Sequence, residues 1–260
     1  MSSRAASDHG KAVYSAISLP LADDEATLLR RRVEESGIAF MAELPRRHAP
    51  ATVRLKELIA TRLGRPRLLF GHRRVPLSGT SATAPPRDKA SESRDLMELV
   101  DWCRYVAGAE PTSVVSVRHA ETPGAETDDY QMMSLDFTAP DGDRLVAGNG
   151  PLAQISCGYY MPRQWEEAVG FRPPAALQVA CEHGIAFIDL PASLVWFDAM
   201  GRHQESLESD RPVGEQMLLQ FHRKVTSLVR AISGLDDTLK AMQIVQAAAT
   251  SQTEGRRVQV

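Results

Sequence analysis

The 260-residue sequence has little of what marks several large classes of protein. Its three cysteines include no C-x-x-C pair, which argues against a disulfide framework and the common zinc motifs. No apolar stretch reaches the roughly 20 residues that span a bilayer, so no membrane segment is expected. A net charge of -3 provides no basic surface for nucleic acid. The sequence also lacks a G-x-G-x-x-G turn, the phosphate-binding element of dinucleotide-binding domains.

The remaining composition is ordinary for a globular protein, with 43% hydrophobic and 24% charged residues. The start of the chain is polar and rich in serine and alanine, without the apolar core of a signal peptide. Reduced, separated thiols and this polar start predict a cytoplasmic protein. No metal site is expected, because the histidines show no ligand spacing; they include His119, His183, His203 and His222.

The first 45 residues predict one βαβ unit. Buried strands are expected over Gly10–Tyr14 and Ile38–Leu44, and a helix over Ala26–Ser36, which Gly37 ends. A strand, a helix and a strand in this order build a parallel sheet. Because nothing before the first strand supplies the glycine-rich turn, residues 1–45 are predicted to be the remnant of a Rossmann-type domain whose opening is absent.

Residues 46–260 predict a second domain built on a sheet. A helix should run from Pro50 to Gly64, followed by a strand over Arg67–Arg74, a loop over Leu77–Ser93 and a helix over Arg94–Val106. Short strands separated by tight turns then follow at Ser113–Arg118, Asp129–Phe137, Arg144–Gly148, Leu152–Tyr159, Ala176–Cys181, Ile185–Leu190 and Leu194–Phe197, with Arg202–Glu208 as a further candidate. This pattern is typical of an antiparallel sheet.

Two helices are expected near the end of the chain. Asp210 and Pro212 indicate the start of the first, and Asp236 is expected to cap the second, which Gly255 ends. The predicted inward stripes are Met217, Leu218, Phe221, Val225, Leu228 and Ile232 on the first helix, and Leu239, Met242, Val245 and Ala249 on the second. A last strand is expected over Arg257–Val260. The predicted fold class is therefore α/β (α+β): a βαβ remnant followed by an open, mostly antiparallel sheet with helices on one face.

This order of elements resembles the Gfo/Idh/MocA oxidoreductases, named after glucose–fructose oxidoreductase and inositol dehydrogenase. Four stretches carry the likeness: GKAVYSAISLPLADDEA, RRHAPATVRLKELIATRLGRPRLL, LMELVDWCRYVAGAEPTSVVSV and the paired helices of the last 40 residues. The resemblance implies a sugar or polyol derivative as substrate, and NAD(P) only where a complete N-terminal domain is present. It also implies a homo-oligomer formed through the open sheet face.

The chain departs from this family where the chemistry is expected. Ala16, Ile17 and Ser18 stand where the family carries E-K-P, and an isoleucine can neither donate nor accept the proton that the lysine handles. The family's D-x-G-x-H-x-x-D frame falls on the segment from Arg94 to Asp101, in which Leu96 replaces the glycine and Glu98 replaces the histidine; only Asp101 is retained.

These positions give the candidate site residues. Glu98 and Asp101 share a helical face and could act as an acid/base pair, although the alternative is a solvated Glu98 and an Asp101 that pairs with an arginine. Arg46 and Arg47 follow a strand end and could bind an anionic substrate group, or form ordinary surface pairs. Tyr159 could line a substrate pocket or belong to the core.

Three functional hypotheses follow from this sequence. The chain could be a Gfo/Idh/MocA-like protein that is not an active dehydrogenase in this form, because the cofactor turn, the lysine and the histidine are missing; it would then bind no cofactor. It could be a non-enzymatic sheet domain that dimerises or binds a small, carbohydrate-like ligand. It could also be part of a longer, divergent NAD(P)-dependent oxidoreductase whose annotated start lies too late.

Overall fold

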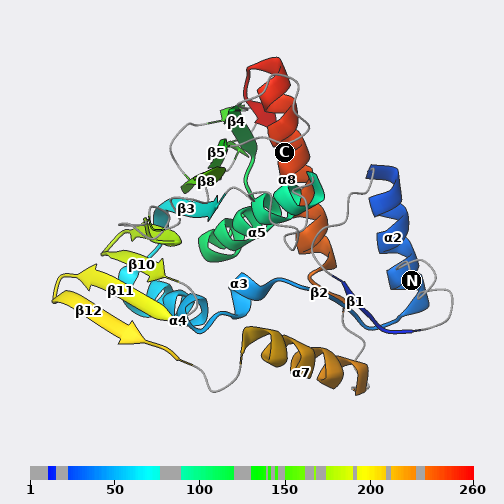
Figure 1. Ribbon diagram of the computed structural model, residues 1–260, viewed down its shortest axis with the longest axis horizontal. Coiled ribbons are helices and arrows are strands. Elements are labelled where there is room, and N and C mark those ends of the chain that lie inside the picture. Colours follow the sequence, from blue (N-terminus) through cyan, green and yellow to red (C-terminus); the bar gives the residue numbers. More distant parts are fainter. Residues whose placement is uncertain are drawn as a thin grey trace.

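The fold joins a small parallel sheet to a large, mostly antiparallel one (Figure 1). The structure is a computed structural model that describes residues 11–15, 23–76, 89–119, 130–138, 140–141, 144–145, 150–161, 167, 174–189, 192–208, 212–226 and 232–260. The predicted cap at Asp210 and the positions Ala16, Ile17 and Ser18 lie outside these residues, as does most of the predicted loop over Leu77–Ser93.

The predicted βαβ unit is confirmed. Strands β1 (Val13–Ser15) and β2 (Phe40–Ala42) pair in parallel, and helix α2 (Asp23–Ser36) connects them. Gly37 follows α2 with a φ of 58°, a left-handed conformation that suits glycine and ends the helix. Phe40 and its neighbours on β2 are buried, so the second strand forms the centre of this small sheet.

The helix that follows the small sheet is also confirmed. After a single helical turn, α3 (Pro45–His48), helix α4 (Pro50–Leu58) continues without interruption into a π-helical turn over Ile59–Leu63. Gly64 ends it with a φ of 73°. Proline suits the first turn of a helix because the amide hydrogen that it lacks has no intrahelical partner there.

Within the described residues, the large sheet has nine strands in the order β12-β11-β10-β9-β3-β8-β5-β4-β14. Of these strands, only the central pair, β3 and β8, is parallel; the other neighbours are antiparallel, as the sequence predicts. The strands are β3 (Pro66–Pro76), β4 (Ser113–His119), β5 (Tyr130–Asp136), β8 (Leu152–Met161), β9 (Leu177–Cys181), β10 (Ile185–Asp189), β11 (Ser193–Asp198), β12 (Gly201–Ser206) and β14 (Val258–Gln259). The short strands β6 (Pro140–Asp141) and β7 (Arg144–Leu145) pair separately.

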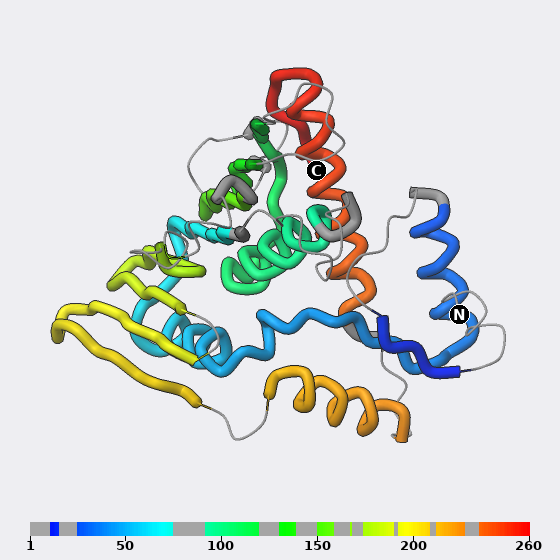
Figure 2. Tube along the Cα trace, viewed as in Figure 1, coloured from blue at the N-terminus to red at the C-terminus, as the bar shows by residue number. Residues whose placement is uncertain are grey.

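Helices cover one face of the large sheet. Helix α5 (Lys89–Ala107) packs on β3 and β8, helix α8 (Leu235–Glu254) packs on β4, and α4 reaches β10 and β11 (Figures 1 and 2). Gly71 of β3 leaves room for the Cys103 sulfur of α5, which would lie 3.4 Å from an added Cβ. The core is therefore a layer between this sheet face and its helices.

The other face of the large sheet has no covering helix among the described residues. Alternate residues of β4 differ in exposure: Val114 is buried, while Val115 and Val117 are 39% and 52% exposed. Leu68, Leu152 and Phe197 of other strands are also exposed. A half-apolar sheet face of this kind is the open face that the sequence predicts.

Helix α8 differs from prediction at two points. Asp236 does not cap α8: Gly234, in a left-handed conformation, occupies the N-cap, and the Thr238 hydroxyl donates to its carbonyl oxygen at 2.7 Å. Ala249 is exposed and its neighbour Ala248 is buried, so the inward stripe was wrong by one residue there. Leu239 and Met242 are buried as predicted.

Helix α7 (Val213–Thr226) buries less than its apolar stripe predicts. Met217 is buried, whereas Leu218 and Val225 are 56% and 47% exposed. The helix packs on the small α3 turn, and Phe221 lies against the ring of Tyr14 on β1, with 5.5 Å between the ring centroids. Ile232 does not continue this helix; with Ser233 it forms β13 (Ile232–Ser233), which pairs in parallel with β2. The small sheet thus gains a strand that lies outside residues 1–45.

Candidate functional site

The α3 turn carries two arginines from the end of β2 to the face of α5. Arg46 and Arg47 follow Pro45 directly, and their side chains are 11% and 15% exposed. On α5, Glu98 and Asp101 are three residues apart and therefore share one face of the helix. The structure brings these four predicted residues together, one arginine to each carboxylate.

Glu98 is held by two arginines. Arg46 Nε donates to Glu98 Oε2 at 3.3 Å, and Arg73 Nη1 donates to the same oxygen at 3.4 Å. Arg73 also pairs with Asp95 at 2.9 Å, one turn earlier on α5. The Arg46 guanidinium lies 5.0 Å from the ring centroid of Trp102. Burial of Arg46 lowers the pKa of its guanidinium, although the charge of Glu98 acts to raise that pKa.

Asp101 is also held by two arginines and is almost fully buried. Arg47 Nε donates to Asp101 Oδ2 at 2.7 Å, and its Nη2 donates to the other carboxylate oxygen, which makes the pair bidentate. Arg104, one turn further on α5, lies 3.4 Å from Asp101 Oδ1. Burial raises the pKa of Asp101, and the charges of these two arginines oppose that shift. Only 3% of the Asp101 side chain is exposed.

The start of α8 completes this cluster. Arg47 Nη1 donates to Asp237 Oδ2 at 2.8 Å, and Arg104 Nη1 donates to the Asp237 carbonyl oxygen at 3.0 Å. Arg104 also forms two 2.8 Å hydrogen bonds with Glu110. Burial acts to raise the pKa of Asp237, but the hydrogen bond and charge of Arg47 outweigh it and leave the pKa lowered. The cluster therefore ties α3, α5 and α8 to one another.

A cavity of about 380 Å³ lies beside this cluster, at the carboxyl end of β2. Ligands of parallel α/β sheets bind at this edge, because the loops that leave the strands meet there. Its lining consists of Met41, Ala42, Leu44, Arg47, His48, Tyr105, Gly234, Leu235, Asp236 and Asp237. Burial lowers the pKa of His48, and the charges of Arg47 and Lys224 add to that effect. The cavity thus presents a guanidinium, a neutral imidazole, a phenol and carboxylates to a ligand.

Sequence reasoning missed several members of the cluster. Arg104 follows Asp101 at the i+3 position, a spacing that could have identified it as a partner. Asp237 and Arg73 come from distant segments, and no local pattern marks them. Tyr159 lies on β8, but its side chain is outside what the structure describes. The roles predicted for Glu98, Asp101, Arg46, Arg47 and Tyr159 in catalysis or binding stay predictions.

Among the described residues, the histidine, cysteine, aspartate and glutamate side chains form no group of three or more that could hold a metal ion. No helix in the same part of the chain combines the length and apolar character needed to cross a membrane.

Comparison with known proteins gives a fold. No protein family and no curated protein matches the sequence. Among solved structures, aldose-aldose oxidoreductase from Caulobacter crescentus, in complex with glycerol, has a TM-score of 0.77 at 16% identity, over 99% of this chain and 75% of its own. Levoglucosan dehydrogenase, in complex with NADH and levoglucosan, has a TM-score of 0.75 at 16% identity, over 99% and 76%. This chain has the fold of the Gfo/Idh/MocA-type oxidoreductases.

A third structure of this type is an oxidoreductase from Agrobacterium radiobacter in complex with NAD+, L-tartaric acid and magnesium. It has a TM-score of 0.74 at 17% identity, over 99% of this chain and 75% of its own. The large sheet and its helices match the C-terminal domain of the Gfo/Idh/MocA fold. Because all three identities are under 25%, the likeness concerns the fold and leaves the chemistry to this chain's own residues.

Proposed function

We propose that this chain binds a small polyhydroxylated molecule in the cavity at the carboxyl end of β2, and that it is not an active dehydrogenase in this form. The observation that carries the proposal is the pairing of the two candidate acid/base carboxylates. Glu98 is paired with Arg46 and Arg73, and Asp101 with Arg47 and Arg104. A carboxylate held in this way must break a charge-assisted hydrogen bond before it can take a proton from a substrate.

The composition of the cavity supports this class of ligand. His48 and Tyr105 are polar residues that line a space of about 380 Å³, within the size of small-ligand pockets, and the paired Arg47 and Asp237 form part of its wall. Glycerol, levoglucosan and L-tartaric acid, the small molecules in the three structures compared above, each carry several hydroxyl groups. Hydroxyl groups both donate and accept hydrogen bonds, as such a lining requires.

Binding can be tested by isothermal titration calorimetry with levoglucosan and L-tartrate. Tyr105→Phe removes the cavity hydroxyl but keeps the ring that lies 5.0 Å from the Arg47 guanidinium. His48→Ala removes the imidazole. Each variant should weaken binding by about tenfold, the effect of losing one useful hydrogen bond. His119→Ala, an exposed histidine at the end of β4, is the matched control and should leave affinity unchanged.

The competing hypothesis is a longer NAD(P)-dependent oxidoreductase acting on a sugar or polyol derivative. NAD+ and NADH are present in two of the solved structures, which favours it. A titration followed by NADH fluorescence separates the two hypotheses, since the proposal expects no change with this chain. Micromolar NADH binding, together with levoglucosan-dependent NAD+ reduction that Glu98→Gln abolishes, would refute the proposal and establish the dehydrogenase.

We further propose a homo-oligomer formed through the open face of the large sheet, in a protein of the cytoplasm. The exposed apolar side chains of Val115, Val117 and Phe197 support the interface, because burial of such a face is favourable. Analytical ultracentrifugation of the wild type and of Val117→Lys tests it. The charge should shift the wild-type oligomer towards monomer, whereas an oligomer unaffected by it would place the interface elsewhere.

A further inference from the structure

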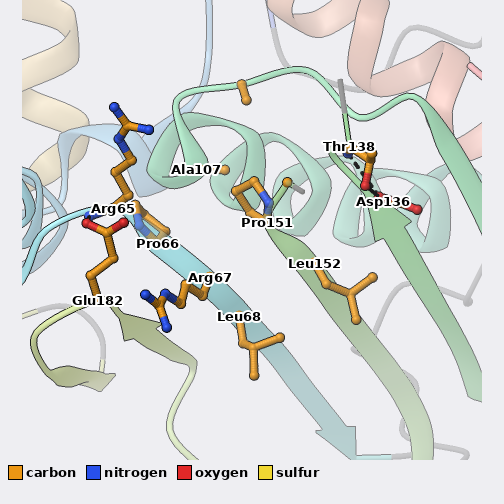
Figure 3. A pocket seen from close by; sticks show the side chains of 12 residues that line it. Arg65, Pro66, Arg67, Leu68, Ala107, Asp136, Thr138, Pro151, Leu152 and Glu182 are labelled. Carbon is orange, nitrogen blue, oxygen red and sulfur yellow. Dashed lines mark hydrogen bonds between the residues drawn. The ribbon is translucent and has the colours of Figure 1, made fainter. Parts of the chain in front are cut away.

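A second cavity lies at the carboxyl end of α5. Its volume is about 810 Å³, and it is lined by Arg65, Pro66, Arg67, Leu68, Ala107, Ala109, Asp136, Thr138, Gly150, Pro151, Leu152 and Glu182 (Figure 3). The lining comes from the amino ends of β3 and β8, the carboxyl end of β5 and the turn between β9 and β10. This cavity shares no lining residue with the one beside Arg47.

The two arginines of this cavity, Arg65 and Arg67, have no side-chain partner among the described residues. The guanidinium groups of Arg65 and Arg67 are exposed and form no hydrogen bond or ion pair with any residue that the structure describes. A guanidinium carries five N–H donors in a planar fork that matches a carboxylate or phosphate. The two guanidinium groups point in different directions, on either side of the Glu182 carboxylate (Figure 3), and each gives this part of the cavity wall a preference for an anion.

The acidic groups of the cavity are already engaged. Asp136 accepts hydrogen bonds from the backbone and hydroxyl of Thr138 and from Arg257 Nη1, the last at 3.0 Å. Burial acts to raise the pKa of Asp136, but these partners outweigh it and leave the pKa lowered. Glu182 Oε2 accepts a hydrogen bond from the backbone amide of Arg65 at 3.2 Å, and Figure 3 shows its carboxylate beside that residue. The arginine side chains are thus free of both carboxylates.

The rest of the lining is apolar. Leu68 and Leu152 are 41% and 43% exposed at the neighbouring amino ends of β3 and β8, and Pro66, Pro151 and Ala107 complete the walls. Burial of such a surface by an apolar ligand is favourable by about 25 cal/mol for each Å². An inorganic anion would satisfy the guanidinium groups but leave these leucines in water.

From these observations we infer that this cavity binds an organic anion: a carboxylate or phosphate group held by Arg67, with the charge of Arg65 adding to the attraction, on an apolar body that lies against Leu68 and Leu152. The site is independent of the ligand proposed for the cavity at β2, whereas Leu68 and Leu152 belong to the open face, so an oligomer through that face and this ligand would compete for them. The site shares no lining residue with the β2 cavity, so either can exist without the other.

Three probes of similar shape test the proposal by calorimetry at low ionic strength. Benzoate and phenyl phosphate carry the two candidate anionic groups, and benzamide is their neutral counterpart. Both anions should bind at least tenfold more tightly than benzamide, and the tighter of the two identifies the preferred head group. Binding should weaken as salt is added, because the guanidinium groups are exposed. The inference would be overturned if benzamide bound as tightly as the anions. It would also be overturned if neither anion bound with a Kd below about 1 mM, which corresponds to a binding free energy of about 4 kcal/mol.

Opposite charge changes in the same cavity sharpen the test. Arg67→Gln should weaken benzoate binding by about tenfold. Glu182→Gln should strengthen it, because it removes an opposing charge and keeps an oxygen for the Arg65 amide. Arg202→Gln, at the far edge strand β12, is the matched control and should change nothing. Circular dichroism checks that each variant is folded, and a folded Arg67→Gln that binds benzoate like the wild type contradicts the site.

Discussion

The arginine–carboxylate cluster makes a strong prediction about stability. Replacing Asp101 by asparagine keeps the shape of the side chain but removes the charge that Arg47 and Arg104 share. The Arg104 side chain is 2% exposed and the Asp101 side chain 3%, so water cannot replace the lost interaction. Breaking a buried pair by neutralising one partner costs about 3–5 kcal/mol. Because Arg104 keeps Glu110 and Asp237, we expect the lower end, a loss of about 3 kcal/mol.

Urea unfolding followed by circular dichroism measures this loss as a lower midpoint at unchanged slope. In a thermal scan it corresponds to a fall of about 6–12 °C for a protein of this size. Asp236→Asn is the matched control, because Asp236 pairs with Arg30 at 3.1 Å where both side chains are more than half exposed. It should change stability by no more than about 0.5 kcal/mol. A loss below about 1 kcal/mol for Asp101→Asn would refute the view that this cluster is a main tie between α3, α5 and α8.

Three further predictions concern a hydrogen bond in the core, the tight backbone packing around Gly150 and the pH dependence of stability. Thr52→Val should cost about 1–3 kcal/mol in urea unfolding, because it leaves the buried Trp102 indole N–H, now 2.9 Å from the threonine hydroxyl, without an acceptor. Gly150→Ala should lower the thermal midpoint, because its Cβ would overlap a backbone carbonyl, whereas Gly214→Ala, which meets nothing, should not. Asp237 has a lowered pKa, so its stabilising effect is present above its ordinary value of 3.8 and lost as the pH falls below it. Midpoints of wild type and Asp237→Asn should therefore differ at pH 7 and converge below about pH 4.

Each of these has an outcome that contradicts it. Thr250→Val is the surface control for the core variant, and equal losses at the two sites would remove the special role of the indole hydrogen bond. A Gly150→Ala protein as stable as wild type would mean that the backbone there can shift at little cost. A constant difference between wild type and Asp237→Asn from pH 7 to pH 3 would mean that the charge of Asp237 contributes nothing to stability.

Local signals predicted most of the fold. Gly37, Gly64, Gly108 and Gly255 all have positive φ values at the ends of helices, where the sequence places helix stops. The strands could be predicted because they are short, alternate between apolar and polar residues and lie between turns. Each of these signals depends on a few neighbouring residues, so it survives without knowledge of the tertiary structure.

The errors arose where distant segments decide the outcome. Ile232 continues the apolar period of α7, but its pairing with Phe40, far away in the chain, makes it a strand. Leu218 fits the helical stripe yet is exposed, because periodicity marks an apolar face without saying whether a partner covers it. Asp236 has the residue type of a cap, and Gly234 occupies that position instead.

The candidate site shows the same division between local and distant information. Helical spacing placed Glu98 and Asp101 on one face, and the strand end placed Arg46 and Arg47 beside them, but only packing pairs each carboxylate with its arginines. The alternative in which Asp101 pairs with an arginine is what the structure has, whereas Glu98 is held by two arginines rather than left to solvent. Because the cluster engages these groups, the side chains open to a ligand in the β2 cavity are neighbours such as His48 and Tyr105. A search for the function of this chain should therefore begin from those neighbours rather than from the carboxylates.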